Sequence, residues 1–300
     1  MMGRSRGWEG VMVEVDYSIR PLCYSHVDLP REFFGGVPIH SGEGVSASPM
    51  IYVLVSGRDA DGTVHHYLVD AGFRAEKWIH RFGFYDYEDP SVVLGKVGVQ
   101  PEEIEKVFIT HMHFDHANNL PSFPNADVYV QWAEYEGWIR ALALAPLYTP
   151  LGDESWITSS FDRDDMEMWG ALARDHRLHF VGDGDELAPG IHAHLSKDGH
   201  TFGSQWLSVA TSGGPYVVAG DTVMWYSNIE EMWPSGYTNG NTYCMLMTYG
   251  EIHGHLDGRI DRIVPGHDTL VFERHPSWKV GPNEVAEVHV AAWDNTRKGS

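Results

Sequence analysis

Residues 107–117 read Val107-Phe-Ile-Thr-His-Met-His-Phe-Asp-His-Ala117, and this stretch determines how the rest of the chain is interpreted. Its first half is rich in β-branched and aromatic residues and predicts a strand over 106–110. That strand runs directly into His111-x-His113-x-Asp115-His116. Where a strand ends, the backbone can turn so that four side chains converge, whereas side chains two residues apart in a helix face apart. The pattern therefore predicts a metal site at the end of this strand.

The spacing of these side chains favours two metal ions over one. Imidazole and carboxylate groups suit zinc, iron and related metals. Because Asp115 and His116 are adjacent, they are hard to place on one metal together with both other histidines, and they fit two ions about 3.5–4 Å apart better. The alternative is a histidine-rich turn in which Asp115 caps the following helix. That alternative does not explain the spacing of the three histidines and Asp115.

Three later strand–turn junctions each carry one more side chain of the ligand type. His200 lies in a Gly-His-Thr turn before a strand expected at 206–210, Asp221 follows a strand at 216–219, and His267 follows a strand at 262–264. Taken singly, Asp221 reads equally well as a helix cap, and the two histidines as ordinary turn residues. Three such junctions in order are far less expected by chance, so we predict that all three residues bind metal.

The remaining periodicity indicates an α/β protein. Strands are expected at 11–19, 50–55, 65–70, 127–131, 178–181 and 191–195, and helices at 75–84, 90–97, 133–144 and 285–293. Two sheets with helices outside is one architecture that fits this order, although the order alone does not choose it over other α/β arrangements.

No composition break marks a linker, so residues 1–300 are expected to form a single domain with one unusual stretch. Residues 151–186 hold ten Asp or Glu against three Arg or Lys. The stretch reads either as a solvated acidic surface helix with loops or as an insert that forms a lid, a pocket wall or a dimer arm.

Composition excludes several classes of partner. The net charge is −21, which argues against nucleic acid and against anionic membrane surfaces, because both are bound mainly through Lys and Arg. No apolar run is long enough for a membrane span, and residues 1–10 lack the apolar core of a signal peptide. We therefore expect a cytoplasmic protein, with Cys23 and Cys244 as free thiols.

With these motifs assembled, the sequence resembles the metallo-β-lactamase superfamily and, within it, the N-acyl-homoserine lactonase-like branch. The first motif, at 111–116, is joined by Leu-Val-Asp-Ala-Gly at 68–72 and by the Gly-His-Thr turn at 199–201. Gly220-Asp221 and Gly266-His267 also match, and Val130-Gln131 with Glu134-Tyr135-Glu136 resembles the lactonase branch in particular.

The resemblance implies an αββα sandwich, in which two mixed β-sheets are flanked by helices, and it assigns the metal ligands. It implies that one metal is held by His111, His113 and His200, a second by Asp115, His116 and His267, and that Asp221 bridges them. The cofactors would be two divalent ions, zinc by default, although the same donors accept manganese, cobalt or iron. Asp70 would orient a ligand histidine, or else simply form a strand-end turn.

The reaction implied is the opening of a lactone or related cyclic ester by a hydroxide that bridges the metals, with Asp115 relaying the proton to the leaving group. Lactonase relatives often carry a tyrosine three residues after the bridging aspartate, and that position is Met224 in this chain. Tyr226 is therefore the candidate for a hydrogen bond to the substrate carbonyl. The alternative for Tyr226 is a core or pocket aromatic.

Eleven tryptophans, among them Trp206, Trp225 and Trp233 near the ligand turns, favour a bulky aromatic pocket and a cyclic or aromatic small-molecule substrate. The alternatives are an amidase or thioesterase acting on an aromatic substrate and, on the same fold, an iron-dependent oxidoreductase. The resemblance also suggests a homodimer. Six further histidines, His65, His66, His192, His194, His253 and His255, are expected not to bind metal.

Overall fold

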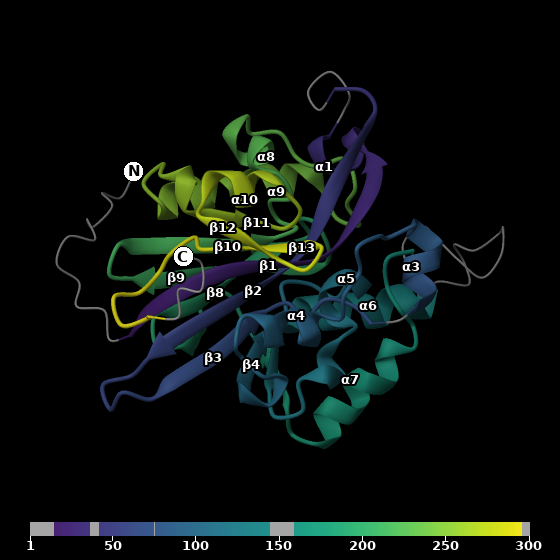
Figure 1. Cartoon of the computed structure of the whole chain (residues 1–300). Coiled ribbons are helices and arrows are strands. Elements are labelled where there is room, and N and C mark those ends of the chain that lie inside the picture. The colour runs from purple at the N-terminus through teal and green to yellow at the C-terminus, as the bar shows by residue number, and fades with distance from the viewer. Residues whose placement is uncertain (1–14, 37–41, 75, 145–158, 296–300) are drawn as a thin grey trace, which may run out of the picture.

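The computed structural model describes residues 15–36, 42–74, 76–144 and 159–295. Two sheets lie face to face and helices cover their outer sides, as Figure 1 shows. Both sheets mix parallel and antiparallel pairing, which confirms the αββα sandwich expected for the chain. In the described ranges, no helix has the length and apolar character needed to cross a membrane.

Among the described residues, the large sheet has eight strands, in the spatial order β12 (Ser277–Val280), β13 (Asn283–Ala286), β1 (Asp16–Pro30), β2 (Val45–Arg58), β3 (Val64–Val69), β4 (Ile104–Phe108), β5 (Asp127–Gln131) and β6 (Leu178–Val181). Pairing is antiparallel from β12 to β3 and parallel from β3 to β6. Since parallel neighbours need crossover connections, helices follow β3 and β5.

In the part of the chain that the structure describes, the small sheet has five strands, in the order β11 (Ile263–Pro265), β10 (Gly214–Gly220), β9 (Gly203–Thr211), β8 (Ile191–Lys197) and β7 (Glu186–Ala188). Only β10 and β11 pair in parallel, whereas β9 runs antiparallel to β10. The carboxyl ends of β10 and β11 therefore lie beside the beginning of β9. Asp221, His267 and His200 occupy the turns at this edge.

Two groups of helices cover the sandwich in Figure 1. Beside the large sheet lie α3 (Glu76–Phe82), α4 (Pro90–Lys96), α5 (Phe114–Ala117), α6 (Trp132–Leu144) and α7 (Asp165–Arg174), with the short turns η1 (Pro101–Glu103) and η2 (Leu120–Ser122). On the other side lie α8 (Tyr226–Glu230), α9 (Thr242–His255), η5 (Ile260–Arg262) and α10 (Leu270–Arg274). A short helix, α1 (Arg31–Gly35), connects β1 to β2.

Strand β2 shows why this sheet reads as a continuous apolar run in the sequence. Ile51, Val53 and Val55 pack into the core shared with the small sheet. Met50, Tyr52 and Leu54 pack into the core shared with α4, α6 and α7. Because alternate side chains of a strand face opposite ways, and both faces are covered, every residue in the run is apolar.

The prediction of a carboxyl-terminal helix at 285–293 is wrong. Residues 277–280 and 283–286 form the hairpin β12–β13, and Val285 pairs with Leu22 of β1. A short apolar run fits either the helical or the strand period, and here the pairing with β1 makes it a strand. Helix α9 was not predicted from the sequence. It contains His253 and His255, and Asn241 caps it by accepting a hydrogen bond from the backbone N–H of Tyr243.

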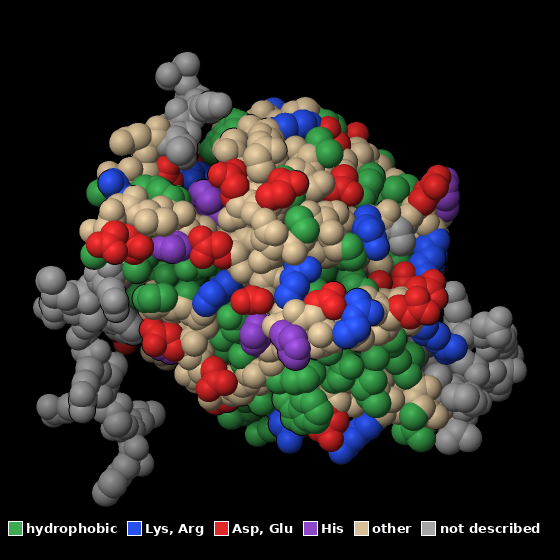
Figure 2. Space-filling view, turned by 90° about the horizontal axis from the view of Figure 1, so that it is seen from below, with side chains coloured by type: hydrophobic (Ala, Val, Ile, Leu, Met, Phe, Trp, Pro, Cys, Tyr) green, Lys and Arg blue, Asp and Glu red, His purple; other side chains and the backbone are tan. Residues whose placement is uncertain are grey.

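The acidic stretch divides between elements of the fold. Residues 151–158 lie outside the described residues, as do residues 11–14 of the first expected strand. Within the described part, 165–174 forms α7, and 178–181 forms β6, which pairs in parallel with β5. The expected function of this stretch as a lid or dimer arm stays a prediction. On the face seen in Figure 2, acidic and basic side chains are interspersed and do not gather into one patch.

Candidate metal centre

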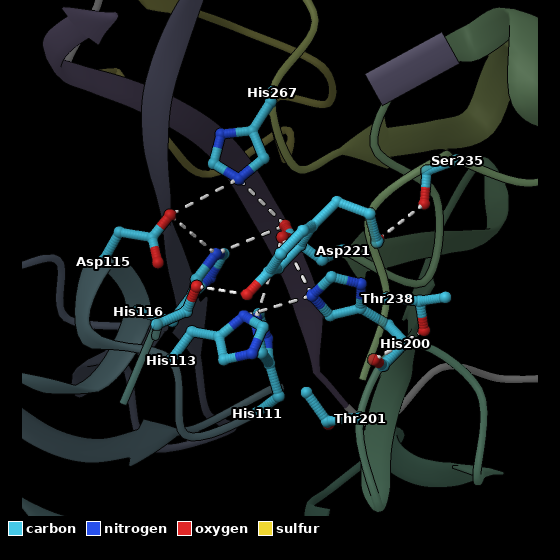
Figure 3. Close-up of polar contacts among 12 residues, drawn as sticks. His111, His113, Asp115, His116, His200, Thr201, Asp221, Ser235, Thr238 and His267 are labelled. Atoms are coloured by element: carbon cyan, nitrogen blue, oxygen red, sulfur yellow. Dashed lines mark hydrogen bonds and ion pairs between the residues drawn. The ribbon is translucent and has the colours of Figure 1, made fainter. Parts of the chain in front are cut away.

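The ends of four strands bring the seven predicted ligands together. The large sheet contributes His111 and His113, which follow β4, and Asp115 and His116, which lie in α5. The small sheet contributes His200 in the turn before β9, Asp221 after β10 and His267 after β11. Figure 3 shows these side chains pointing toward one another: His111, His113, Asp115, His116, His200, Asp221 and His267. All are buried except Asp115, which is partly exposed.

The seven side chains form two clusters with Asp221 between them. His111, His113, His200 and Asp221 make one cluster, and Asp115, His116 and His267 make the other, with ligand atoms within 4.8 Å of one another in each. Oδ2 of Asp221 lies 3.4 Å from Nε2 of His200. Its Oδ1 lies 3.2 Å from Nε2 of His116 and 3.0 Å from Nε2 of His267. One oxygen faces each cluster, as in a bridging carboxylate.

The donor set fits two divalent ions. Nε2 of His111 is buried and has no hydrogen-bond partner among the described residues, and the nearest oxygen of Asp221 lies 3.8 Å away. Leaving a polar nitrogen buried and unpaired costs free energy, so the arrangement is better explained by an ion than by packing. Five imidazoles with two carboxylates are the ligand chemistry that zinc and related metals prefer.

The electrostatics of the clusters differ. Burial lowers the pKa of His113 to about 4 and that of His200 to about 3. Both rings are therefore neutral at pH 7 and able to bind a metal. Burial also acts to lower the pKa of His116 and His267, but the neighbouring carboxylates of Asp221 and Asp115 together outweigh it, so the pKa of both is raised. A metal at this second cluster would displace protons.

Most ligand imidazoles are held through their other ring nitrogen. Nδ1 of His116 donates to Asp70 at 2.7 Å, Nε2 of His113 to Oδ1 of Asn239 at 2.7 Å, and Nδ1 of His267 to the carbonyl of Pro49 at 3.0 Å. Such contacts set the tautomer and the orientation of each ring. They leave the opposite nitrogen of each ring facing the clusters.

Asp70 connects this centre to the end of β4. It follows β3 in a left-handed conformation, with a φ of 65°. Its Oδ1 accepts a hydrogen bond from the backbone N–H of Thr110 at 2.7 Å, while its Oδ2 accepts from His116. This geometry supports the expectation that Asp70 orients a ligand histidine, and the strand-end turn is the means by which it does so.

Asp70→Asn is expected to weaken metal binding about 10- to 100-fold, because the amide is a poorer acceptor for the His116 ring. Asparagine tolerates the left-handed backbone, so the fold should be kept. Competition with a chromogenic chelator measures the change. Asp86→Asn is the matched control, since Asp86 is exposed and also has a positive φ. Equal metal affinity in the two variants would remove Asp70 from the metal centre.

Glu134 supports the metal centre, although no motif in the sequence predicted this contact. It is fully buried on α6. Oε1 accepts from the backbone N–H of Met112 at 2.9 Å and from Nε1 of Trp138 at 2.7 Å. Oε2 accepts from Oγ1 of Thr201 and the backbone N–H of Gly203, both at 2.7 Å. One carboxylate thus joins the loop of His111 and His113 to the turn of His200. Only its place in the lactonase-like motif could have pointed to it.

A cavity of roughly 120 Å³ opens on the centre. Four ligands line it: His113, Asp115, Asp221 and His267. Its other walls are mainly apolar and include Val27, Phe33, Phe34, Phe82, Phe84 and Met224. None of Trp206, Trp225 and Trp233 lines this cavity, and its aromatic wall is built from phenylalanines together with Tyr237.

The structure corrects the expectation for Tyr226. Its side chain is fully buried in the core shared by the two sheets, and its hydroxyl donates to the carbonyl of Ile263 at 3.0 Å. The guanidinium of Arg274 lies 4.0 Å from the ring centroid. Because α8 begins at this residue and turns the ring inward, Tyr226 does not line the cavity and is a core aromatic.

Neither cluster contains any of the six histidines expected not to bind metal. His65 contacts Glu105 and Asp59, and Nδ1 of His66 lies 2.8 Å from Oγ of Ser56. His194 stacks on Trp206 with ring centroids 3.9 Å apart. These rings serve local structure.

Comparison with known proteins matches residues 51–267 to the Metallo-beta-lactamase superfamily. The chain is 27% identical over 188 residues to the N-acyl homoserine lactonase AttM of Rhizobium johnstonii, covering 61% of this chain and 66% of that protein. It is 26% identical over 183 residues to the N-acyl homoserine lactonase AiiB of Agrobacterium fabrum, covering 60% and 62%. The match thus spans less than two thirds of the length of either relative.

Among solved structures, a probable metal-dependent hydrolase from Staphylococcus aureus superposes with a TM-score of 0.64 at 22% identity, covering 84% of this chain and 90% of that one. A quorum-quenching N-acyl homoserine lactone lactonase superposes with a TM-score of 0.63 at 19% identity, covering 89% and 97%. At these identities, the likeness shows a shared fold.

Proposed function

Since the chain belongs to the metallo-beta-lactamase superfamily, we propose that its metal centre hydrolyses lactones or related cyclic esters. The observation that carries the proposal is the position of Asp221. Its two oxygens face two separate clusters of ligand atoms, and Asp221 also lines the apolar cavity. A carbonyl compound seated in that cavity would meet both clusters at once.

The two clusters would hold two divalent ions, with zinc favoured by the five imidazoles. Bound ions would lower the pKa of water and polarise a carbonyl oxygen, which makes a nucleophile and a Lewis acid available at neutral pH. The protein's own contribution is to fix the ligands, through contacts such as Asp70 to His116, and to exclude bulk water with the apolar walls of the cavity.

Asp115 is the residue best placed to move a proton. It lines the cavity, and its Oδ2 lies 3.5 Å from Nε2 of His116 and 3.7 Å from Nε2 of His267. In ring opening, water oxygen bonds to the carbonyl carbon, the ring C–O bond breaks, and the leaving alkoxide takes up a proton. We assign to Asp115 the transfer of that proton from the attacking water to the alkoxide, which yields a hydroxy acid.

The relatives favour lactones as the substrate class, whereas the lining of the cavity is also compatible with a second class of substrate. Both relatives named above are N-acyl homoserine lactonases, but their identity to this chain is low. The phenylalanine-lined wall also fits an aromatic ester, thioester or amide. An amidase or thioesterase acting on an aromatic substrate is therefore the second candidate, and an oxidoreductase using iron is the third, because the same donors accept iron.

The deciding experiment is base consumption at constant pH by zinc-loaded protein against homoserine lactones, aromatic lactones, aryl esters, thioesters and anilides, each of which releases a proton when it is hydrolysed. Turnover of lactones above the other classes is expected, because both relatives named above are lactonases. His113→Ala protein serves as the blank, and His80→Ala is the matched control because His80 is exposed. Cleavage of aryl esters, thioesters or amides without lactone turnover would favour the second candidate. If no compound in the panel were hydrolysed and the iron-loaded protein consumed oxygen, the third candidate, the iron-dependent oxidoreductase, would be favoured.

The partners and the location of the protein also stay proposals. We infer a small-molecule substrate and a homodimer, with no nucleic-acid or membrane partner, in the cytoplasm. The net charge of −21 supports the two exclusions.

A further inference from the structure

The loop of residues 235–240, with the sequence Ser-Gly-Tyr-Thr-Asn-Gly, is fixed to the metal centre. Oγ1 of Thr238 donates to the carbonyl of His200 at 2.8 Å, as can be followed in Figure 3. The backbone N–H of Asn239 donates to the same carbonyl at 2.9 Å. Oδ1 of Asn239 accepts from Nε2 of His113 at 2.7 Å. The 235–240 loop therefore holds two ligand histidines and cannot shift independently of them.

Two glycines allow this close approach. A Cβ added at Gly240 would lie 2.0 Å from the carbonyl oxygen of Gly199, and one added at Gly236 would lie 2.0 Å from that of Glu32. Both are backbone atoms that cannot move aside, so only glycine fits. The loop is thereby clamped between the ligand turn at 199–200 and α1, with Tyr237 between the two clamps.

Tyr237 forms part of the cavity wall beside the ligands. Its ring stacks on Phe33 at 4.5 Å between centroids, and its centroid lies 6.0 Å from that of His113 and 6.3 Å from that of His200. Its hydroxyl lies 2.6 Å from Oγ of Ser160 and 3.1 Å from Oγ of Ser159. Both serines line the same cavity. The three hydroxyls form a polar group on a largely apolar wall.

The other two candidates for a carbonyl contact do not supply a donor. Met224 lines the cavity, but its thioether has no proton to donate. Tyr226 lies in the core, where its hydroxyl already donates to Ile263. The phenol of Tyr237 lines the same cavity as His113, Asp115, Asp221 and His267.

We propose that Tyr237 donates a hydrogen bond to the carbonyl oxygen of the substrate, a contact supplied by the 235–240 loop rather than by the segment after Asp221. The proposal rests on the hydrolytic function proposed above, although not on the lactone in particular. When the carbonyl enters, Ser160 donates to the phenol oxygen, which frees the phenol proton for the substrate and strengthens it as a donor. Since negative charge grows on the carbonyl oxygen during attack, the bond is stronger in the transition state than in the ground state.

The test is Tyr237→Phe in the metal-loaded protein, with Tyr226→Phe as the matched control. In Tyr237→Phe, kcat is expected to fall about 100-fold, the usual cost of losing one donor to a developing oxyanion. KM and the metal content should stay close to those of the wild type. Tyr226→Phe should keep the wild-type kcat. A structural function for Tyr237 would instead lower the metal content or raise KM together with the loss of kcat.

A phosphonate that mimics the tetrahedral state provides a readout that does not need turnover. Its dissociation constant should rise about as much as kcat falls in Tyr237→Phe, because transition-state mimics report the same contact. Unchanged kcat and unchanged phosphonate binding would overturn the proposal while leaving the hydrolase function intact. If the wild type opens no lactone, the proposed substrate fails, and Tyr237 is then judged on phosphonate binding and on whichever ester or amide is cleaved.

Discussion

Asp221→Ala is expected to abolish turnover and to lose bound metal. The carboxylate approaches imidazoles of both clusters, at 3.0 Å from Nε2 of His267 and 3.4 Å from Nε2 of His200. Its removal takes a ligand and a negative charge from both sides of the centre. Two divalent ions close together in a buried site repel one another strongly unless a shared anion lies between them. One substitution therefore disables both clusters.

The measurement is metal content by elemental analysis after gel filtration, together with turnover of the best substrate in the panel. Asp221→Asn separates charge from shape, because it keeps an oxygen but loses the charge, and it should retain less metal than the wild type. Asp164→Asn is the control, since 89% of that side chain is exposed. A full complement of metal in Asp221→Ala would rule out a shared ligand at this position.

Glu134→Ala is expected to destabilise the protein by about 3–5 kcal/mol, because it leaves four buried donors without an acceptor. Three of those donors, on Met112, Thr201 and Gly203, belong to the segments that carry His111, His113 and His200. The fourth is Nε1 of Trp138 on the same helix as Glu134. Metal affinity should therefore fall as well, by about 10- to 100-fold. Glu134→Gln should be intermediate, because its NH₂ group would face two donors instead of accepting from them.

Denaturant unfolding of the metal-loaded protein measures the first effect, and chelator competition measures the second. Glu136→Ala is the matched control on the same helix. Glu136 pairs with Arg140 at the surface, and that contact contributes at most about 0.5 kcal/mol. If Glu134→Ala unfolded at the same denaturant concentration as Glu136→Ala, the carboxylate would not be what joins the two ligand loops.

The metal centre was largely predictable because each of its parts has a local signature. A β-branched strand followed by closely spaced His and Asp residues reveals a strand–turn junction, and the same pattern recurs at His200, Asp221 and His267. Strands such as β5 and β6 have the bounds that their alternation predicted. The resemblance then ordered these junctions into one fold. Each local motif identifies its own ligand residue, whereas the resemblance, and not the spacing, indicates that these residues come together.

By itself, the sequence determined the fold class and which seven side chains would meet. Which side chains surround them was decided only in the tertiary structure. Tyr226 is two residues from Met224 yet lies in the core, whereas Tyr237 reaches the cavity through contacts with Phe33 and Ser160, far away in the chain. Strand β13 is likewise defined by its pairing with β1. Local periodicity shows that a residue is buried, but which surface buries it depends on segments hundreds of residues apart.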